Sequence, residues 1–109
     1  METFLLLFVG RAAAPEADDE TTQDYNRQWV AYMGGLAQRG VLKGGAPLAP
    51  TGLTVGPDGT GPFAMADVDV GGYLLVEAES LEAAAELAQD APHIALGGTT
   101  IVRACLPTG

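Results

Sequence analysis

The chain has 109 residues, a length that predicts one domain, residues 1–109, with a single core. Hydrophobic residues make up 48% of it and charged residues 17%, which excludes a disordered acidic tail. Five basic residues stand against fourteen acidic ones, so the net charge is -9. Nucleic-acid phosphates and anionic membrane surfaces repel such a chain, so we expect neither as a partner.

The cysteine content and the first residues bear on the compartment. Cys105 is the single cysteine, which excludes an internal disulfide and fits a reducing cytoplasm. The apolar run Phe4–Val9 follows Glu2 and no basic residue, which argues against a signal peptide. No apolar run approaches the ~20 residues of a membrane helix. We therefore expect a cytoplasmic protein whose first strand spans Thr3–Val9.

A helix is predicted to follow, opened by Thr21 or Thr22 as N-cap and closed by Gly40 after Arg39 in its last turn. Its apolar residues recur with the period of a helix and share one face. An aromatic stripe at this spacing is typical of a core, and we interpret it so. The stripe consists of Tyr25, Trp29, Tyr32, Met33 and Leu36.

The second half of the chain alternates strand and helix signals. Residues 41–63 are rich in glycine and proline, and predict short strands at 41–43 and 53–55 with a turn at 57–59. A strand over 73–78 follows Gly71 and Gly72, and the last strand spans 99–106. Between them Ser80 caps a helix that stops before Pro92. We expect its buried stripe to be Leu81, Ala84, Ala85, Leu87 and Ala88.

These elements predict a sheet with two apolar faces. In the first strand Phe4, Leu6 and Phe8 alternate with Leu5, Leu7 and Val9, and the later strands repeat this pattern. Right-handed crossovers place both helices on one face. Each large apolar side chain left in water on the other face costs about 1.5–3 kcal/mol. We therefore expect a homodimer packed sheet to sheet, the alternative being that residues 44–62 fold over that face.

Several stretches together resemble the YCII-related family, in its DGPF-type branch. The first strand resembles that family's opening strand, and Gly61-Pro62-Phe63 resembles the last three letters of its DGPF signature. The remaining matches are GVLKGG at 40–45, GGYLLV at 71–76, SLEAA at 80–84, APH at 91–93 and GTTIVR at 98–103. Their order and spacing cover nearly the whole chain.

The resemblance implies an α+β protein with a ferredoxin-like βαββαβ sandwich. Its antiparallel sheet would carry two helices on one face, and two copies would form a dimeric α+β barrel. The family's role is mostly undefined, although a histidine–aspartate pair has been suggested as catalytic in one branch. Here Thr60 stands at the signature aspartate, and the first helix has no histidine. These departures put the transfer of catalysis in doubt.

Four residues are candidates for acid–base work or anion binding. His93, the single histidine, lies near Asp90 and titrates near neutral pH, although a hydrogen bond to a helix end would equally account for it. Asp67 and Asp69 point the same way in an extended chain, where they would act as acid and base or belong to a solvated loop. Arg103, in an apolar strand, needs a carboxylate from the protein or from a ligand.

Three further sequence features exclude a kind of site or have a structural interpretation. We expect no cofactor and no metal, since one histidine and one cysteine exclude a structural zinc site within one chain. The glycine-rich stretch 40–61 lacks the context of a phosphate loop. Cys105 is interpreted as a small core residue.

Two functions remain open. In the first, a small-molecule-binding protein or cofactor-independent enzyme performs proton transfer, isomerisation or elimination on a small anionic or aromatic compound. Its pocket would lie between the sheet and the first helix or in the dimer barrel, with Tyr73, His93 and Arg103 as polar contacts. In the second, a dimeric accessory or regulatory domain has no catalytic role and binds a basic protein through its acidic surface. Convergence of His93 and Arg103 on one apolar cavity would favour the first.

Overall fold

The structure, a computed structural model, describes residues 1–10, 19–49, 51–63 and 69–107. Four strands form one antiparallel sheet with the order β2-β5-β1-β6, and β3 pairs only with β4. The elements are β1 (Glu2–Val9), α1 (Asp19–Gln38), β2 (Leu42–Pro47), β3 (Leu53–Gly56), β4 (Gly59–Pro62), β5 (Val70–Ala78), α2 (Leu81–Ala88), η2 (Ile94–Leu96) and β6 (Thr99–Ala104).

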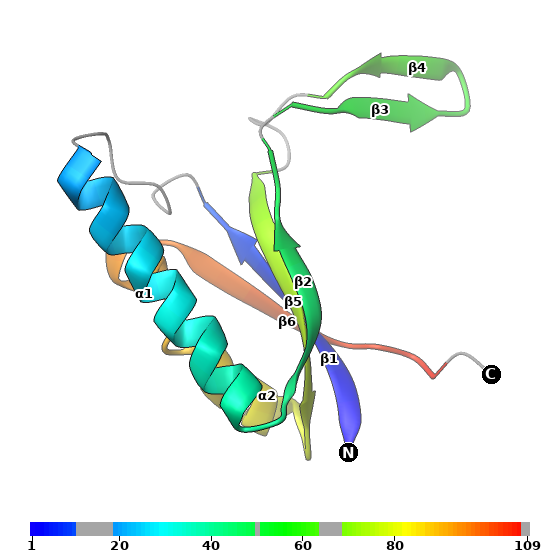
Figure 1. The fold of residues 1–109 in the computed structure, drawn as a ribbon. Helices are drawn as coiled ribbons and strands as arrows, with labels where there is room; N and C mark the ends of the chain where they lie inside the picture. Colours follow the sequence, from blue (N-terminus) through cyan, green and yellow to red (C-terminus); the bar gives the residue numbers. More distant parts are fainter. Residues whose placement is uncertain (11–18, 50, 64–68, 108–109) are drawn as a thin grey trace.

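Both α-helices lie on the same face of the four-stranded sheet, here called the covered face (Figure 1). Leu6 of β1 pairs with Leu74 of β5 on one side and with Val102 of β6 on the other. This order and these helices confirm the expected ferredoxin-like sandwich. The core is Phe4, Leu6, Phe8, Leu36, Leu74, Val76, Ala78, Ala84, Leu87, Ala88 and Ala91, each less than a tenth exposed.

Helix α1 starts earlier than the sequence indicates and ends as predicted. It begins at Asp19, so Thr21 and Thr22 lie inside its first turns and neither is the N-cap. At its other end the Gly40 amide donates to the Ala37 carbonyl and the Val41 amide to the Leu36 carbonyl. This pair of bonds is a Schellman motif, and Gly40 takes the positive φ of 74° that the motif requires. Arg39 therefore follows the helix instead of occupying its last turn.

Helix α2 begins directly after its N-cap residue, Ser80. The Ser80 hydroxyl accepts a hydrogen bond from the Ala83 amide at 3.1 Å, which confirms the predicted N-cap. Ala84, Leu87 and Ala88 are buried as expected. The prediction for Leu81 was wrong, because this first residue of the helix is 47% exposed.

Several strand boundaries differ from the sequence predictions, and strand β4 was not predicted. β2 runs to Pro47, because the glycines and the alanine after Lys43 continue to pair with β5. Gly71 and Gly72 lie inside β5, at an irregularity in its pairing with β1 between Phe8 and Val9. β6 ends at Ala104, so Cys105 is exposed and its assignment to the core was wrong.

The other face of the sheet, here called the open face, is covered by none of the described segments. Its central side chains are Leu5, Leu7, Tyr73 and Leu75, each half-buried, with Ile101 at 45% exposure beside them. The β3–β4 hairpin does not fold over this face as the alternative required. Figure 1 shows the hairpin beyond the end of β2, standing clear of both helices and extending away from them.

Candidate aromatic pocket

A pocket of about 400 Å³ lies between α1 and the β2–β5 side of the covered face. This volume is within the range of small-molecule sites. Among the described residues, its lining contains no acidic or basic side chain. The lining residues are Phe8 of β1, Tyr25, Asn26, Trp29 and Met33 of α1, residues 45–48 of β2 and its extension, and residues 71–74 of β5.

Aromatic rings form the wall of this pocket toward α1. The rings of Phe8 and Trp29 meet edge to face with centroids 5.0 Å apart, and Tyr25 meets Trp29 in the same manner at 6.3 Å. Such edge-to-face pairs hold the rings in defined orientations. The wall is therefore an ordered aromatic surface, against which a planar ring can stack.

The helical period that predicted a core stripe placed these residues on the correct face of α1. Their role differs from that expectation: of the stripe only Leu36 is fully buried, while Trp29 and Met33 are half-buried and line the pocket. A signal was present in the sequence, since bulky aromatics on α1 oppose Gly45, Gly71 and Gly72 on the strands. Glycines have no side chain to fill the space that faces these rings.

His93 is fully buried directly behind this aromatic wall. Its ring stacks on Trp29 with centroids 5.6 Å apart and an interplanar angle of 20°, and it meets Phe8 edge to face at 5.0 Å. Phe8 and Trp29 line the pocket, whereas His93 does not. The histidine therefore contacts the rings that a ligand would contact.

Hydrogen bonding determines which nitrogen of His93 carries the proton. Nε2 lies 3.0 Å from the Thr99 carbonyl, and since a carbonyl only accepts, Nε2 donates. The Thr100 hydroxyl lies 3.2 Å from the same nitrogen. Nδ1 is buried and finds no hydrogen-bond partner among the described residues. With Nε2 as the donor, Nδ1 of the neutral tautomer carries the lone pair and is a hydrogen-bond acceptor.

The approach of Gly98 holds His93 in this position. A Cβ atom at Gly98 would lie 2.5 Å from His93 Cδ2 and 2.9 Å from the His93 carbonyl oxygen. The Gly98 amide donates to that same carbonyl at 2.9 Å. Only glycine allows the backbone before β6 to pass so close to the ring.

Tyr32, about one turn after Trp29 on α1, links this helix to α2. Its hydroxyl donates to the Leu87 carbonyl at 2.7 Å, and the Trp29 and Tyr32 rings meet edge to face at 5.8 Å. Burial, together with the negative charge of Asp90, raises the pKa of Tyr32 to about 12. Burial also raises the pKa of Tyr25, an effect that a hydrogen bond with Trp29 partly offsets. Both phenols therefore remain neutral donors at physiological pH.

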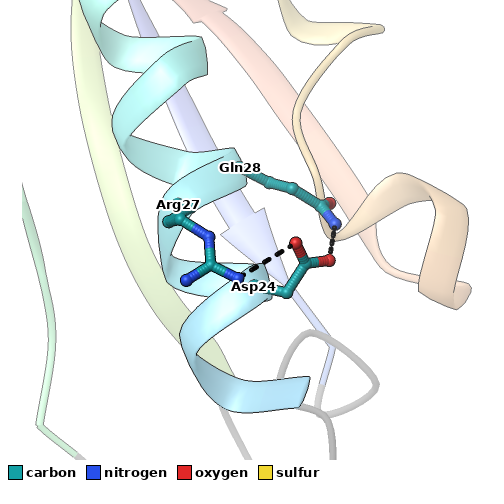
Figure 2. Close-up of polar contacts among 3 residues, drawn as sticks. All are labelled: Asp24, Arg27 and Gln28. Atoms are coloured by element: carbon teal, nitrogen blue, oxygen red, sulfur yellow. Dashed lines mark hydrogen bonds and ion pairs between the residues drawn. The ribbon is translucent and has the colours of Figure 1, made fainter. Parts of the chain in front are cut away.

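Charged side chains near the pocket are turned away from it. Arg27 lies 3.5 Å from Asp24 on the exposed side of α1, where the Gln28 amide also donates to Asp24 at 3.0 Å (Figure 2). Lys43 lies 2.7 Å from Glu77, and this hydrogen bond lowers the pKa of the Glu77 carboxyl. Exposed pairs of this kind contribute little to stability. They leave the described part of the pocket without a charge.

The structure separates the residues that the sequence grouped as one site. Alternation along β6 puts Thr100, next to His93, on the covered face and Arg103 on the open face, where Arg103 is exposed. Tyr73 contributes to the pocket lining from β5, but the same alternation puts its side chain on the open face beside Leu75. His93 and Arg103 therefore do not converge within one subunit.

Of the aspartate pair, Asp69 lies among the described residues. Asp69 lies just before β5, and its carbonyl accepts a hydrogen bond from the Gly10 amide at 3.1 Å. This contact ties the start of β5 to the end of β1, next to the pocket. Asp67 lies outside the described residues.

Two further properties concern the described residues alone. No cluster of three or more histidine, cysteine, aspartate or glutamate side chains suited to a metal ion occurs among them. Within the same ranges, neither helix is long and apolar enough to cross a membrane.

Comparison with known proteins identifies the family. The family model of the YCII-related domain matches residues 4–105, nearly the whole chain. The chain belongs to the YCII-related family. No curated protein sequence matches this YCII-related protein significantly.

A solved structure supports the same fold. It is the 5-chloro-2-hydroxyhydroquinone dehydrochlorinase TftG of Burkholderia phenoliruptrix AC1100, in complex with 2,5-dihydroxybenzoquinone. The two chains share 19% identity over 98% of this YCII-related protein and 95% of the other chain, with a TM-score of 0.59. At this identity the likeness establishes the ferredoxin-like fold alone.

Proposed function

We propose that this protein binds a small, uncharged, planar aromatic compound in the pocket between α1 and the sheet. The observation that carries the proposal is the ordered wall of Phe8, Tyr25 and Trp29, in a lining whose described residues carry no charged side chain. Aromatic faces stack on planar rings, and an uncharged lining gives no compensation for a desolvated anion. Of the aromatic and anionic ligand classes that the sequence left open, these features favour the aromatic class. The small ring compound bound by TftG is consistent with it.

Binding is testable because Trp29 is the single tryptophan of the chain. In a ¹H–¹⁵N correlation spectrum its indole N–H gives one signal. Titration with hydroquinone should shift this signal until binding saturates. The matched anion 4-hydroxybenzoate should shift it far less. Equal responses to the two compounds, or no response to hydroquinone, would refute an uncharged aromatic site.

A pair of variants tests the location of binding. Tyr25 lines the pocket and meets Trp29 edge to face, so Tyr25→Ala should remove part of the aromatic wall and weaken the response to hydroquinone. Val30 is 67% exposed on the same helix and does not line the pocket. The control Val30→Ala should leave hydroquinone binding unchanged. Wild-type affinity for hydroquinone in Tyr25→Ala would place the site elsewhere.

We propose further that His93 is the acid–base group in an enzymatic reaction at this site. Support comes from the Nδ1 lone pair, which has no partner among the described residues, and from the stacking of the ring on Trp29. The role requires the ligand to reach Nδ1 past the Phe8 and Trp29 rings that separate it from the pocket. A dehydrochlorination of the kind named for TftG removes a proton as well as chloride, and so needs a base. Asp67 and Asp69 stay candidates for the second carboxylate of such a site.

The variant His93→Gln separates this role from packing. Its amide can still donate to the Thr99 carbonyl, whereas His93→Ala would leave a cavity at a fully buried position. We expect His93→Gln to retain hydroquinone binding. Chloride release from 5-chloro-2-hydroxyhydroquinone, measured with an ion-selective electrode, should fall about a hundredfold or more relative to the wild type. A rate equal to wild type would exclude His93 as the base.

We propose that two copies associate through their open faces. Leu5, Leu7 and Leu75 are half-buried there in the subunit, and burying the remainder of each gains about 1 kcal/mol. Arg103 and Tyr73 would then line the interior between the two sheets, where Arg103 would be available to an anionic ligand. Light scattering at micromolar concentration should give the mass of a dimer, and a monomer would refute this assembly.

A second function has one observation in its favour. His93 and Arg103 lie on opposite faces of β6, so one subunit lacks the combined polar site that an enzyme acting on an anion would use. A non-catalytic dimeric accessory domain, with a net charge of -9 that attracts basic partners, needs no such site. Hydroquinone binding without chloride release would favour this function over the enzymatic one.

A further inference from the structure

The β3–β4 hairpin is an exposed element that the subunit itself does not support. All residues from 51 to 60 are exposed, and Leu53 and Val55 remain 73% and 77% accessible. A hydrogen bond from the Phe63 amide to the Gly52 carbonyl at 3.3 Å closes the base of the hairpin, one residue beyond the pairing of β3 with β4. A two-stranded hairpin alone is at best marginally stable in water. Its order therefore calls for a surface to pack on.

One side of the hairpin is suited to such packing. Leu53 and Val55 are two residues apart on β3, so their side chains share a face, and across from them lie Pro62 and Thr60 of β4. Thr54 points to the other side, opposite Gly61. The hairpin thus has one apolar face and one face of small polar residues.

The charge distribution indicates what this apolar face meets. The chain carries fourteen acidic residues, but between 51 and 63 the only charged one is Asp58, at the turn. The repulsion between two copies with a net charge of -9 each is weakest where their contact surfaces carry no charged side chains. The centre of the open face, Leu5, Leu7 and Leu75, also lacks acidic side chains. The hairpin and the open face are thus the surfaces on which a second copy can approach.

We propose that the hairpin is an arm that clasps the second copy of this chain, burying Leu53 and Val55 against it and extending the interface of the open faces. This inference rests on the dimer proposed above. The position of the arm agrees with it, because Figure 1 shows the hairpin extending away from the helices that occupy the covered face. A flat subunit, 44 × 40 × 19 Å, leaves such an arm free to reach past its own sheet.

The test is a dilution series in sedimentation velocity on matched variants. Leu53→Thr with Val55→Thr places β-branched residues, which favour strands, at both positions of β3 but removes the apolar face. We expect it to raise the dimer dissociation constant at least about tenfold. The control Thr54→Val adds an apolar residue to the opposite face and should leave the constant within about twofold. Far-UV circular dichroism should show the same secondary structure for the double variant as for wild type.

Hydrogen exchange on the wild type supplies a measurement that needs no variant. Amides of residues 53–62 should be protected at a concentration where the dimer prevails and lose that protection on dilution. A wild type that is monomeric throughout would overturn the dimer and the arm together. A stable dimer whose dissociation constant is unchanged in the double variant, with hairpin exchange independent of concentration, would overturn the arm alone.

Discussion

The two faces of the sheet are built from the same kinds of residue and differ in what meets them. On β1, Phe4, Leu6 and Phe8 are at most 7% exposed under the helices, while Leu5 and Leu7 between them stay half-buried. Hydrophobicity alone does not distinguish the two sets. The apolar residues of the covered face are buried by the chain's own helices. Burial of the open face depends on another molecule. Stability should therefore depend on the first, and assembly on the second.

The largest effect expected from this difference is on folding. Leu6→Ala should lower the free energy of unfolding by about 2–5 kcal/mol, because the fully buried site leaves a cavity. Its neighbour Leu5→Ala should cost less than half as much. Urea unfolding at a protein concentration below the dimer dissociation constant measures both. Equal losses would contradict the distinction between the faces.

A charge on the open face should act on assembly. Leu75→Asp leaves the covered face intact, so the monomer should remain folded by circular dichroism. An unpaired carboxylate in a sheet-to-sheet interface should raise the dimer dissociation constant at least about a hundredfold. Sedimentation velocity tests this, with Leu75→Val as the apolar control. A dimer of wild-type affinity in Leu75→Asp would show that this face is not the contact.

Two glycines, Gly98 beside His93 and Gly34 in α1, should respond in opposite ways when replaced by alanine. Gly98→Ala forces a Cβ atom against the histidine ring and should cost about 1–3 kcal/mol of stability. At Gly34 in α1 a Cβ atom would meet nothing within 4 Å, so Gly34→Ala should stabilise the protein by about 1 kcal/mol. Thermal unfolding of the two variants should shift in opposite directions. A shift in the same direction would argue against the close packing of Gly98 on His93.

The smallest effect concerns alkaline pH. The pKa of Tyr32 is about 12 in the folded chain against 10.0 for an unperturbed tyrosine. Between these two pH values the folded state keeps the phenol proton, whereas the unfolded chain loses it. Its contribution to stability is complete below pH 10 and declines as the pH rises from 10 to 12. Tyr32→Phe removes the hydrogen bond to Leu87, costing about 1 kcal/mol at neutral pH. Urea unfolding across this pH range should show a shallower decline in the variant.

Local signals explain how much of the fold was predictable. The period of α1, the Ser80 cap and Gly40 each act within one or two turns, and the structure confirms all three. Element ends were less accurate, because pairing with β5 extends β2 through glycines that have no strand preference of their own. The family resemblance is confirmed over residues 4–105.

The candidate site was less predictable, because it depends on distant contacts. His93 was found as a residue, but its stacking on Trp29 joins positions 64 apart in the chain, and no local pattern encodes it. Arg103 was expected to be buried, yet it is exposed, since burial on the open face requires a partner. Tyr25 and Trp29 were interpreted as core, although they line the pocket.

The amino-acid sequence is sufficient to predict the layers of this protein: the two helices and the strands of the main sheet, the apolar character of both sheet faces, and the coverage of one face by both helices. These properties follow from periodicity, caps and crossover handedness, which act locally or by general rule. Packing between distant segments produces the aromatic pocket under α1, the hydrogen bond from His93 Nε2 to the Thr99 carbonyl, and the placement of His93 on the face of β6 opposite to Arg103. Cavities, tautomers and the neighbours of each sheet face depend on such contacts, which no local pattern encodes.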